Sequence, residues 1–265
     1  MNSQNNAVRV SAARGANASH SNTELHLVTG EPVALPEPST ARVAVIGLGY
    51  VGLPLICGFS KNSRAIGFDI NADKIAELKR GTDSTGEVTG TELAGADAEF
   101  TTDPKAIEMA DVVVVCVPTP VNSRNRPDYG PLLAASRVIG KHMKQGAVVV
   151  YESTVDPGTT EDKCLPILEQ ISGLKCGIDF YLGYSPERIN PADPTRKLKD
   201  IKKIVAGSCP VVTAFLEKLY GRVVDAGLFP AASIRVAEAA KILENTQRDV
   251  NIALMNELMA PLIFG

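Results

Sequence analysis

The amino-acid sequence predicts an α/β protein with a Rossmann-like, doubly wound parallel sheet, followed by a long connecting or dimerisation helix. From Ala41 onward, short apolar segments alternate with helix-like segments, which is the pattern of a parallel sheet covered by helices on both faces. The first apolar segment runs into Gly47, Gly49 and Gly52, which have the G-x-G-x-x-G spacing of a dinucleotide-binding turn. Residues 231–260 contain neither glycine nor proline and predict one helix of about 28 residues.

The apolar segments and the stretches between them locate the expected elements. Strands are expected at residues 42–47, 65–69, 112–117, 147–151, 180–184 and 201–206. Helices are expected at residues 51–61, 72–80, 104–109, 130–143, 158–171 and 210–220. The turn-rich stretches 81–97 and 118–128 are expected to be loops. Pro261 is expected to end the long helix, because proline lacks an N–H group and its ring clashes with the preceding turn.

The composition excludes several classes of protein. Of the 265 residues, 45% are hydrophobic and 22% are charged, as in ordinary soluble domains. The net charge of −3 provides no basic surface for nucleic acid, and no apolar run has the length of a membrane span. The five cysteines and three histidines lack the spacing of metal ligands, so no metal is expected. The unpaired cysteine pattern also indicates a reducing, cytoplasmic location.

The glycine turn and a following acidic residue together predict the cofactor. Gly47 permits the tight turn, Gly49 lets a pyrophosphate approach the backbone, and Gly52 lets the helix pack closely on the strand. Asp69 ends the second expected strand. Its carboxylate can accept hydrogen bonds from the adenosine ribose and would repel a 2′-phosphate, so NAD is expected and NADP is not.

The chain therefore divides into three expected parts. Residues 1–40 are expected to form a flexible tail, because they lack the basic start and apolar core of a signal peptide. Residues 41–228 are expected to form the NAD-binding Rossmann domain. Residues 229–265 are expected to carry the long central helix and the start of a truncated middle domain.

Polar residues follow several expected strands at the edge where a doubly wound sheet binds its ligands. They are Thr119, Thr154, Glu187 and Arg188. Each one alone suits a turn or a helix cap as well as a site. On the long helix, Lys241, Asn245 and Arg248 are spaced i, i+4 and i+7 and share one face, which could be a solvated face or the wall of an active site.

Five motifs occur in order and cover nearly everything from residue 41 to residue 258. They are G-L-G-Y-V-G-L-P, V-P-T-P, E-S-T-V-x-P-G-T-T, Y-S-P-E-R-I-N-P and V-A-E-A-A-K-x-x-E-N-T-Q-R-D. With these motifs the chain resembles the UDP-sugar 6-dehydrogenase family, which includes UDP-glucose, UDP-N-acetylmannosamine and UDP-N-acetylglucosamine dehydrogenases. The S-P-E-R-I-N-P form resembles the N-acetyl-sugar branch, in particular the bacterial UDP-N-acetylglucosamine enzymes of surface-polysaccharide (Vi-antigen-like) pathways.

The resemblance implies roles for individual residues. Contacts with NAD are implied for Tyr50, Val51, Asp69, Lys74, Thr119 and Thr154. Contacts with a UDP-N-acetylhexosamine are implied for Glu187, Arg188, Ile189, Lys241, Asn245 and Arg248. Lys241 would be the general acid and base, and Thr154, Glu187 and Asn245 would assist catalysis. The family oxidises the C6 alcohol of the sugar to a carboxylate with two NAD⁺, through a cysteine thioester.

One departure from the family pattern limits the expectation. The family's nucleophilic cysteine lies in a G-G-x-C motif downstream of the long helix, and no such motif occurs in this sequence. From the sequence we also expect the family's second Rossmann-like domain, which helps to bind UDP, to be missing. We therefore expect a C-terminally truncated, catalytically impaired chain that binds NAD but does not complete the four-electron reaction.

Two other functions remain open from the sequence. A two-electron β-hydroxyacid dehydrogenase shares the order of Rossmann domain, long helix and helix lysine, and needs no cysteine. A non-catalytic NAD-binding or dimerising fragment would also need none. A homodimer through the long helix is expected from the apolar positions Leu243, Val250, Leu254 and Leu258, although this stripe would equally suit packing on the chain's own sheet.

Overall fold

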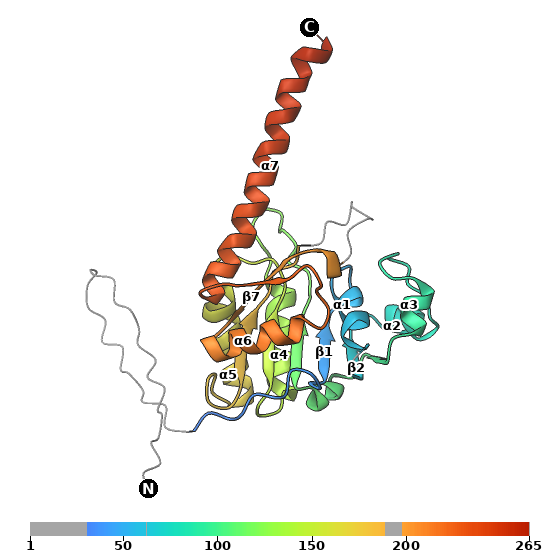
Figure 1. The fold of residues 1–265 in the computed structure, drawn as a ribbon, viewed down its shortest axis with the longest axis vertical. Coiled ribbons are helices and arrows are strands. Elements are labelled where there is room, and N and C mark those ends of the chain that lie inside the picture. The colour runs from blue at the N-terminus through green and yellow to red at the C-terminus, as the bar shows by residue number, and fades with distance from the viewer. Residues whose placement is uncertain (1–30, 62, 189–197, 265) are drawn as a thin grey trace, which may run out of the picture. The chain divides into compact units, whose positions relative to one another are not determined.

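A computed structural model describes residues 31–61, 63–188 and 198–264, and side chains as far as residue 259. Its centre is an eight-stranded sheet in the order β3-β2-β1-β4-β5-β6-β7-β8 (Figure 1). The strands are β1 Val43–Ile46, β2 Ala65–Phe68, β3 Ala98–Thr101, β4 Val112–Val115, β5 Val148–Tyr151, β6 Tyr181–Tyr184, β7 Lys203–Gly207 and β8 Leu228–Pro230. The predicted Rossmann-like α/β fold is confirmed.

Helices cover the sheet. They are α1 Gly52–Phe59, α2 Ala72–Lys79, α3 Gly90–Ala94, α4 Gly130–His142, α5 Leu165–Ser172, α6 Pro210–Tyr220 and α7 Ile234–Phe264, with short 3₁₀ or π segments η1 Pro104–Met109, η2 Thr160–Cys164 and η3 Leu198–Asp200. Figure 1 shows α1 and α6 in front of the strands and α4 and α5 behind them.

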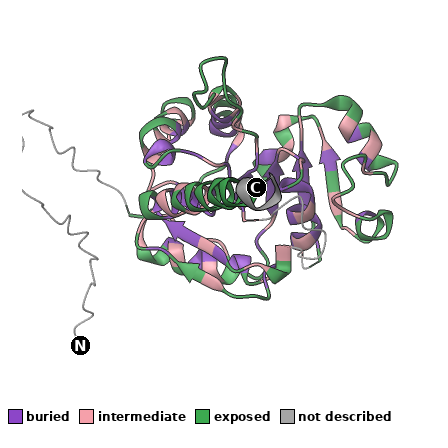
Figure 2. Cartoon of the chain, turned by 90° about the horizontal axis from the view of Figure 1, so that it is seen from above, coloured by how far each residue is buried: buried purple, intermediate pink, exposed green. Residues whose placement is uncertain are grey.

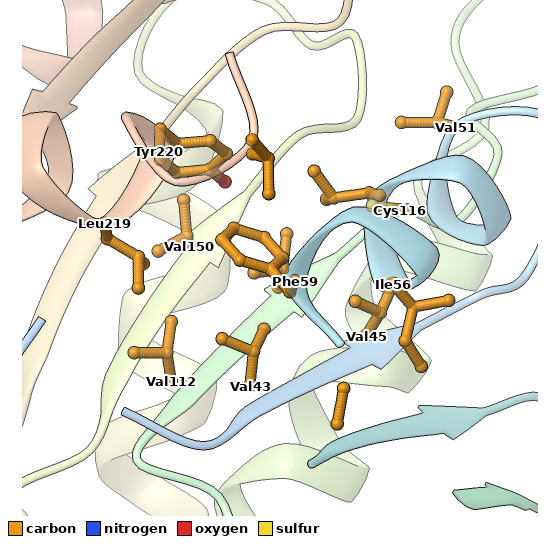
Figure 3. Close-up of a cluster of buried hydrophobic side chains, with 14 of the residues drawn as sticks. Val43, Val45, Val51, Ile56, Phe59, Val112, Cys116, Val150, Leu219 and Tyr220 are labelled. Atoms are coloured by element: carbon orange, nitrogen blue, oxygen red, sulfur yellow. The ribbon is translucent and has the colours of Figure 1, made fainter. Parts of the chain in front are cut away.

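The central strands are buried on both faces, which explains their continuous apolar sequences. Within β1, Val43 and Val45 pack into the cluster beneath α1 and α6, whereas Ala44 and Ile46 pack into the cluster beneath α4 and α5. Figure 3 shows the first of these clusters, which includes Val43, Val45, Val112 and Val150. There the rings of Phe59 from α1 and Tyr220 from α6 meet edge to face, with centroids 5.7 Å apart.

The sheet is parallel from β3 to β6, but β7 runs antiparallel to β6, which corrects the expectation of a wholly parallel sheet. The physical reason lies in the connection, because the described residues between β6 and β7 contain only the three-residue η3, which is too short for a crossover helix. A parallel neighbour needs a crossover, usually a helix, whereas an antiparallel neighbour does not. β8 then pairs parallel with β7.

Sequence reasoning missed four short elements, namely β3, β8, α3 and η3. The strand β3 has one buried side chain, Phe100, and β8 has none, so neither shows the apolar run of a central strand. The helix α3 lies within the stretch 81–97 that was expected to be a loop. Thr89 and Glu92 form a capping box that starts this five-residue helix.

The helix α7 runs for 31 residues and continues past Pro261, so the expectation that Pro261 ends it is wrong. Pro261 removes one intrahelical hydrogen bond near the end of the helix, and the last residues remain helical despite this loss. From Thr246 to Met259 every side chain of α7 is exposed, as the green stretch of this helix in Figure 2 shows.

Part of the predicted flexible tail 1–40 is attached to the domain, with Val33 and Leu35 packed against its core. The amide of Val33 donates to the carbonyl of Ile178 at 2.8 Å, and the hydroxyl of Tyr181 donates to the carbonyl of Val33. The guanidinium of Arg222 donates to the carbonyl of Pro38 at 3.0 Å. Residues 31–40 are therefore attached at several points, and residues 1–30 lie outside the described part of the chain.

Arg222 generates a prediction about stability. Besides Pro38, its guanidinium donates to the carbonyls of Ala41 and Phe59 and to the hydroxyl of Ser63. Arg222→Met leaves these acceptors unpaired, so we expect the free energy of unfolding to fall by about 1–3 kcal/mol in urea denaturation followed by circular dichroism.

The matched control is Arg64→Met, because the Arg64 side chain is 61% exposed and forms one surface ion pair. Its loss should change the free energy of unfolding by no more than about 0.5 kcal/mol. Equal effects of the two substitutions would contradict the structural role of Arg222.

Candidate functional site

The glycine turn between β1 and α1 gives each glycine a separate role. Gly47 has a φ of +90°, and a Cβ atom there would lie 3.0 Å from the carbonyl oxygen of Cys116. A Cβ atom at Gly52 would lie 1.9 Å from the carbonyl oxygen of Gly47, so helix and turn touch directly. Nothing lies within 4 Å of the corresponding position at Gly49. The geometry thus combines a tight turn, a close contact and one open face at the helix N-terminus.

Asp69 connects the end of β2 to this turn. Its Oδ2 accepts a hydrogen bond from the amide of Leu48 at 2.9 Å, and its Oδ1 accepts one from the amide of Asn71 at 2.9 Å. A carboxylate offers about four lone-pair positions, so two such bonds leave capacity for ligand hydroxyls. The structure therefore places the predicted ribose-binding acid next to the open glycine.

Thr119 follows β4 at the same edge. Its Oγ1 is buried and has no hydrogen-bond partner within the part of the chain that the structure describes. The loop is held from the next strand, because Ser153 Oγ donates to the carbonyl of Val117 at 2.6 Å. A buried hydroxyl without a partner needs an explanation, and a bound dinucleotide would provide a partner. The open face at Gly49, the Asp69 carboxylate and Thr119 together fit such a ligand.

Lys241 projects from α7 onto the loop that follows β6. Its side chain is nearly buried, and Nζ donates a hydrogen bond to the carbonyl of Glu187. Burial lowers the pKa of Lys241, although the charges of Glu187 and Glu244 oppose the shift. Burial and then the charge of Glu187 raise the pKa of Tyr50 in the glycine turn. The Glu187 loop thus contacts Lys241 directly, and the charge of Glu187 also acts on Tyr50 in the glycine turn.

Two guanidinium groups share one carboxylate beside this lysine. Arg188 Nη2 lies 2.8 Å and Arg248 Nη2 lies 2.7 Å from Oε1 of Glu244. Along α7, Lys241 is buried, Asn245 is half-buried and Arg248 is exposed, so the predicted face leads outward from the sheet edge. Together, the two guanidinium groups and the single carboxylate carry one net positive charge, which favours an anionic ligand.

The structure links only some of the predicted site residues to one another. In the described ranges, no hydrogen bond joins the side chains of Lys74, Thr154 or Asn245 to the rest of the site. The amide of Lys74 donates to Asn71 Oδ1 at 3.1 Å at the start of α2. Val51 is the N-cap of α1. Ile189 lies outside the described residues.

Sequence reasoning missed Glu238, a fully buried carboxylate on the first turns of α7. Its Oε2 accepts the amide of Gly158 at 2.5 Å, and its Oε1 accepts the amide of Thr160 at 2.9 Å. The pair of bonds attaches α7 to the loop after β5. The sequence did contain a signal for Glu238. It precedes Lys241 by three residues, so the two side chains lie on the same side of the helix.

Sequence reasoning also missed a buried ion pair between Glu152 and Lys203. Lys203 Nζ lies 2.7 Å from Glu152 Oε2, with both side chains at most 3% exposed. Glu152 opens the E-S-T-V motif, which gave a signal, whereas Lys203 begins β7 and belongs to no motif.

Three of the cysteines are not activated as nucleophiles. Burial raises the pKa of Cys57 and Cys164 to about 11 and that of Cys176 to about 12, so these thiols stay protonated at neutral pH. Across residues 31–61, 63–188 and 198–264, no group of three or more His, Cys, Asp or Glu side chains is arranged to hold a metal ion. None of the described helices is both long and apolar enough to cross a membrane.

The mostly parallel sheet, the glycine turn and the acid after β2 define a Rossmann-like dinucleotide-binding domain. Residues 41–224 match the sequence profile of the NAD binding domain of the UDP-glucose/GDP-mannose dehydrogenase family. The chain belongs to this family, as the motifs predicted.

Relatives of known function and structure agree with this assignment. The chain is 51% identical to the UDP-N-acetyl-D-glucosamine 6-dehydrogenase of Pseudomonas aeruginosa over 218 residues, which cover 82% of the chain and 52% of that protein. The Salmonella typhi protein of the same name is 49% identical over 82% of the chain and 51% of its own length. The structure of a UDP-D-ManNAc dehydrogenase from Pyrococcus horikoshii is 35% identical, with a TM-score of 0.75 over 82% of the chain and 52% of that protein. The chain thus spans about half the length of the relatives it matches.

The contact of Glu238 yields a prediction about the docking of α7. Glu238→Gln keeps the shape of the side chain but leaves one of the two amides, of Gly158 or Thr160, facing an NH₂ group. We expect the free energy of unfolding to fall by about 1–3 kcal/mol, measured by urea denaturation.

Glu161→Gln is the matched control, because that carboxylate is partly exposed and pairs with the exposed Arg235. This control should lose no more than about 1 kcal/mol. A Glu238 variant as stable as the unmodified chain would show that the buried carboxylate does not anchor α7.

Proposed function

We propose that this chain carries the NAD-dependent part of a UDP-N-acetylhexosamine 6-dehydrogenase, which oxidises the C6 alcohol of UDP-GlcNAc or UDP-ManNAc to the uronic acid used in polysaccharide biosynthesis. The observation that carries the proposal is the nearly buried amine of Lys241, held at the Glu187 loop beside the glycine turn. Its lowered pKa suits proton transfer to and from a sugar hydroxyl.

The proposed cofactor site uses the edge formed by β1, β2 and β4. The residues proposed to hold NAD are Gly47, Gly49, Tyr50, Val51, Gly52, Asp69, Lys74, Thr119 and Thr154. When bound, NAD⁺ supplies the hydride acceptor. The open face at Gly49 admits the pyrophosphate, and Asp69 receives the ribose hydroxyls.

The proposed substrate site uses the loop after β6 and the outward face of α7. The residues proposed to hold the UDP-sugar are Glu187, Arg188, Ile189, Lys241, Asn245 and Arg248. Two guanidinium groups on one carboxylate leave a positive charge for a diphosphate. Lys241 would take the proton of the C6 hydroxyl and stabilise the oxyanion that develops, while Thr154, Glu187 and Asn245 would orient the reacting atoms.

We also propose a homodimer through α7. The apolar side chains of Leu243, Val250, Leu254 and Leu258 are each more than half exposed. They follow one face of the helix and do not pack on the chain's own sheet. Covering this face with a second copy would remove the apolar side chains from water.

A binding and turnover experiment tests the proposal. The purified chain is titrated calorimetrically with NAD⁺, then with UDP-GlcNAc, UDP-ManNAc and UDP-glucose, and NADH is followed by absorbance. We expect NAD⁺ to bind and the UDP-N-acetylhexosamines to bind more tightly than UDP-glucose. NAD⁺ binding without any UDP-sugar binding would support a non-catalytic NAD-binding role, and oxidation of a β-hydroxyacid would reject the proposed substrate class.

Asp69 provides a sharper test of the cofactor site. Asp69→Asn keeps an oxygen that can accept the amide of Leu48 but removes the negative charge. We expect the affinity for NAD⁺ to fall about tenfold, because hydrogen bonds to a charged acceptor are the stronger ones. The preference for NAD⁺ over NADP⁺ should narrow, since nothing then repels the 2′-phosphate.

The control is Asp73→Asn, an exposed carboxylate in the first turn of α2. It should leave both affinities within about twofold of the unmodified chain. Unchanged NAD⁺ affinity in the Asp69 variant would remove Asp69 from the cofactor site.

A further inference from the structure

The ion pair of Glu152 and Lys203 lies at the carboxyl edge of the sheet and has no assigned role. Glu152 follows β5, Lys203 begins β7, and their side chains are 0% and 3% exposed, respectively. The hydroxyl of Tyr220 on α6 donates to the other oxygen of Glu152 at 2.6 Å. The pair therefore joins three elements that surround the loop after β6.

Lys203 uses its remaining donors on that loop. Its Nζ lies 3.4 Å from the carbonyl oxygen of Ser185 and 3.3 Å from that of Pro186. The next carbonyl, of Glu187, accepts the hydrogen bond from Lys241. Three consecutive carbonyls are thus held by two lysines, Lys203 from within the sheet and Lys241 from α7.

The charges of Glu152 and Lys203 make this arrangement of the loop rigid. Burial by itself would lower the pKa of Lys203, but the charges of Glu152 and Glu187 and the hydrogen bond to Glu152 together raise it, so the net pKa is raised and the amine stays charged at neutral pH. A buried ammonium must keep its acceptors, because losing them costs far more than losing an exposed contact. The loop that contacts Lys241 is therefore held by Lys203, whose buried ammonium group is costly to separate from its acceptors.

We propose that Lys203, oriented by Glu152, is a positioning residue that holds the Ser185–Pro186–Glu187 backbone in place and so seats the amine of Lys241. The proposal rests on the proposed function, in which Lys241 moves the proton. Within the described residues, the hydrogen bonds of Lys203 Nζ go to Glu152 and to the carbonyls of Ser185 and Pro186.

The test uses Glu152→Gln combined with Lys203→Met, which removes both charges and leaves the net charge unchanged. The pKa of Lys241 is measured from the pH dependence of its trace labelling with acetic anhydride, read by mass spectrometry in the full chain. In the unmodified chain the pKa should lie below the ordinary lysine value of 10.5. In the double variant it should rise toward that value, because a loosened loop lets water reach the amine.

Tyr220→Phe is a milder variant in case the double variant does not fold. It keeps the ring and removes one hydrogen bond to Glu152, so the same shift should appear with smaller size. Arg222→Met is the matched control: it also removes a cation that bonds to backbone carbonyls, but at the segment 31–41 and Phe59, and it should leave the pKa of Lys241 unchanged.

The outcomes separate the two proposals. An unmodified chain with a lowered Lys241 pKa that stays equally low in the double variant and in Tyr220→Phe would overturn the positioning role alone. An ordinary lysine pKa in the unmodified chain would overturn the proton-transfer role of Lys241 and the positioning role with it. A shift of the same size in Arg222→Met would show that general loss of stability, and not the Lys203 contact, moves the pKa.

Discussion

The parallel alignment of β1 to β6 is the constraint on which the rest of the structure depends. Each central strand is buried on both faces, so its direction and register are specified by two apolar clusters at once. Because the strands share one direction, the residues that follow them meet at one edge. The glycine turn, Asp69, Thr119, Glu152 and Glu187 are separated in sequence yet share this edge for that reason alone.

At this edge the backbone is held mainly by buried side chains. Glu238 accepts two amides of the loop after β5, and Lys203 donates to two carbonyls of the loop after β6. Both loops lead to residues of the proposed catalytic site. Buried charges contribute little net stability, since desolvation offsets their attraction, but they penalise any arrangement that leaves them unpaired. Their effect here is to restrict the loops to one geometry.

Among the residues that the structure describes, the side chains of α7 that are buried against the domain lie in its first turns. Glu238 and Lys241 are buried against the loops, whereas every side chain from Thr246 to Met259 is exposed. The helix therefore presents a fixed functional end and a long uncovered apolar face. The proposed function places the chemistry at the buried end of the helix, next to Lys241.

Local sequence determined the glycine turn, the six most apolar strands, most helices and the acid that follows β2, because these depend on periodicity and on residue types at short range. It also grouped Lys241, Asn245 and Arg248 on one helix face. Only the tertiary structure decided the antiparallel direction of β7, the edge strands β3 and β8, and the attachment of residues 31–40. Only the folded chain brought Lys203 to Glu152, and Glu238 to Gly158, across 51 and 80 positions. Such contacts carry no local pattern, since each depends on where two distant strands or helices end in space.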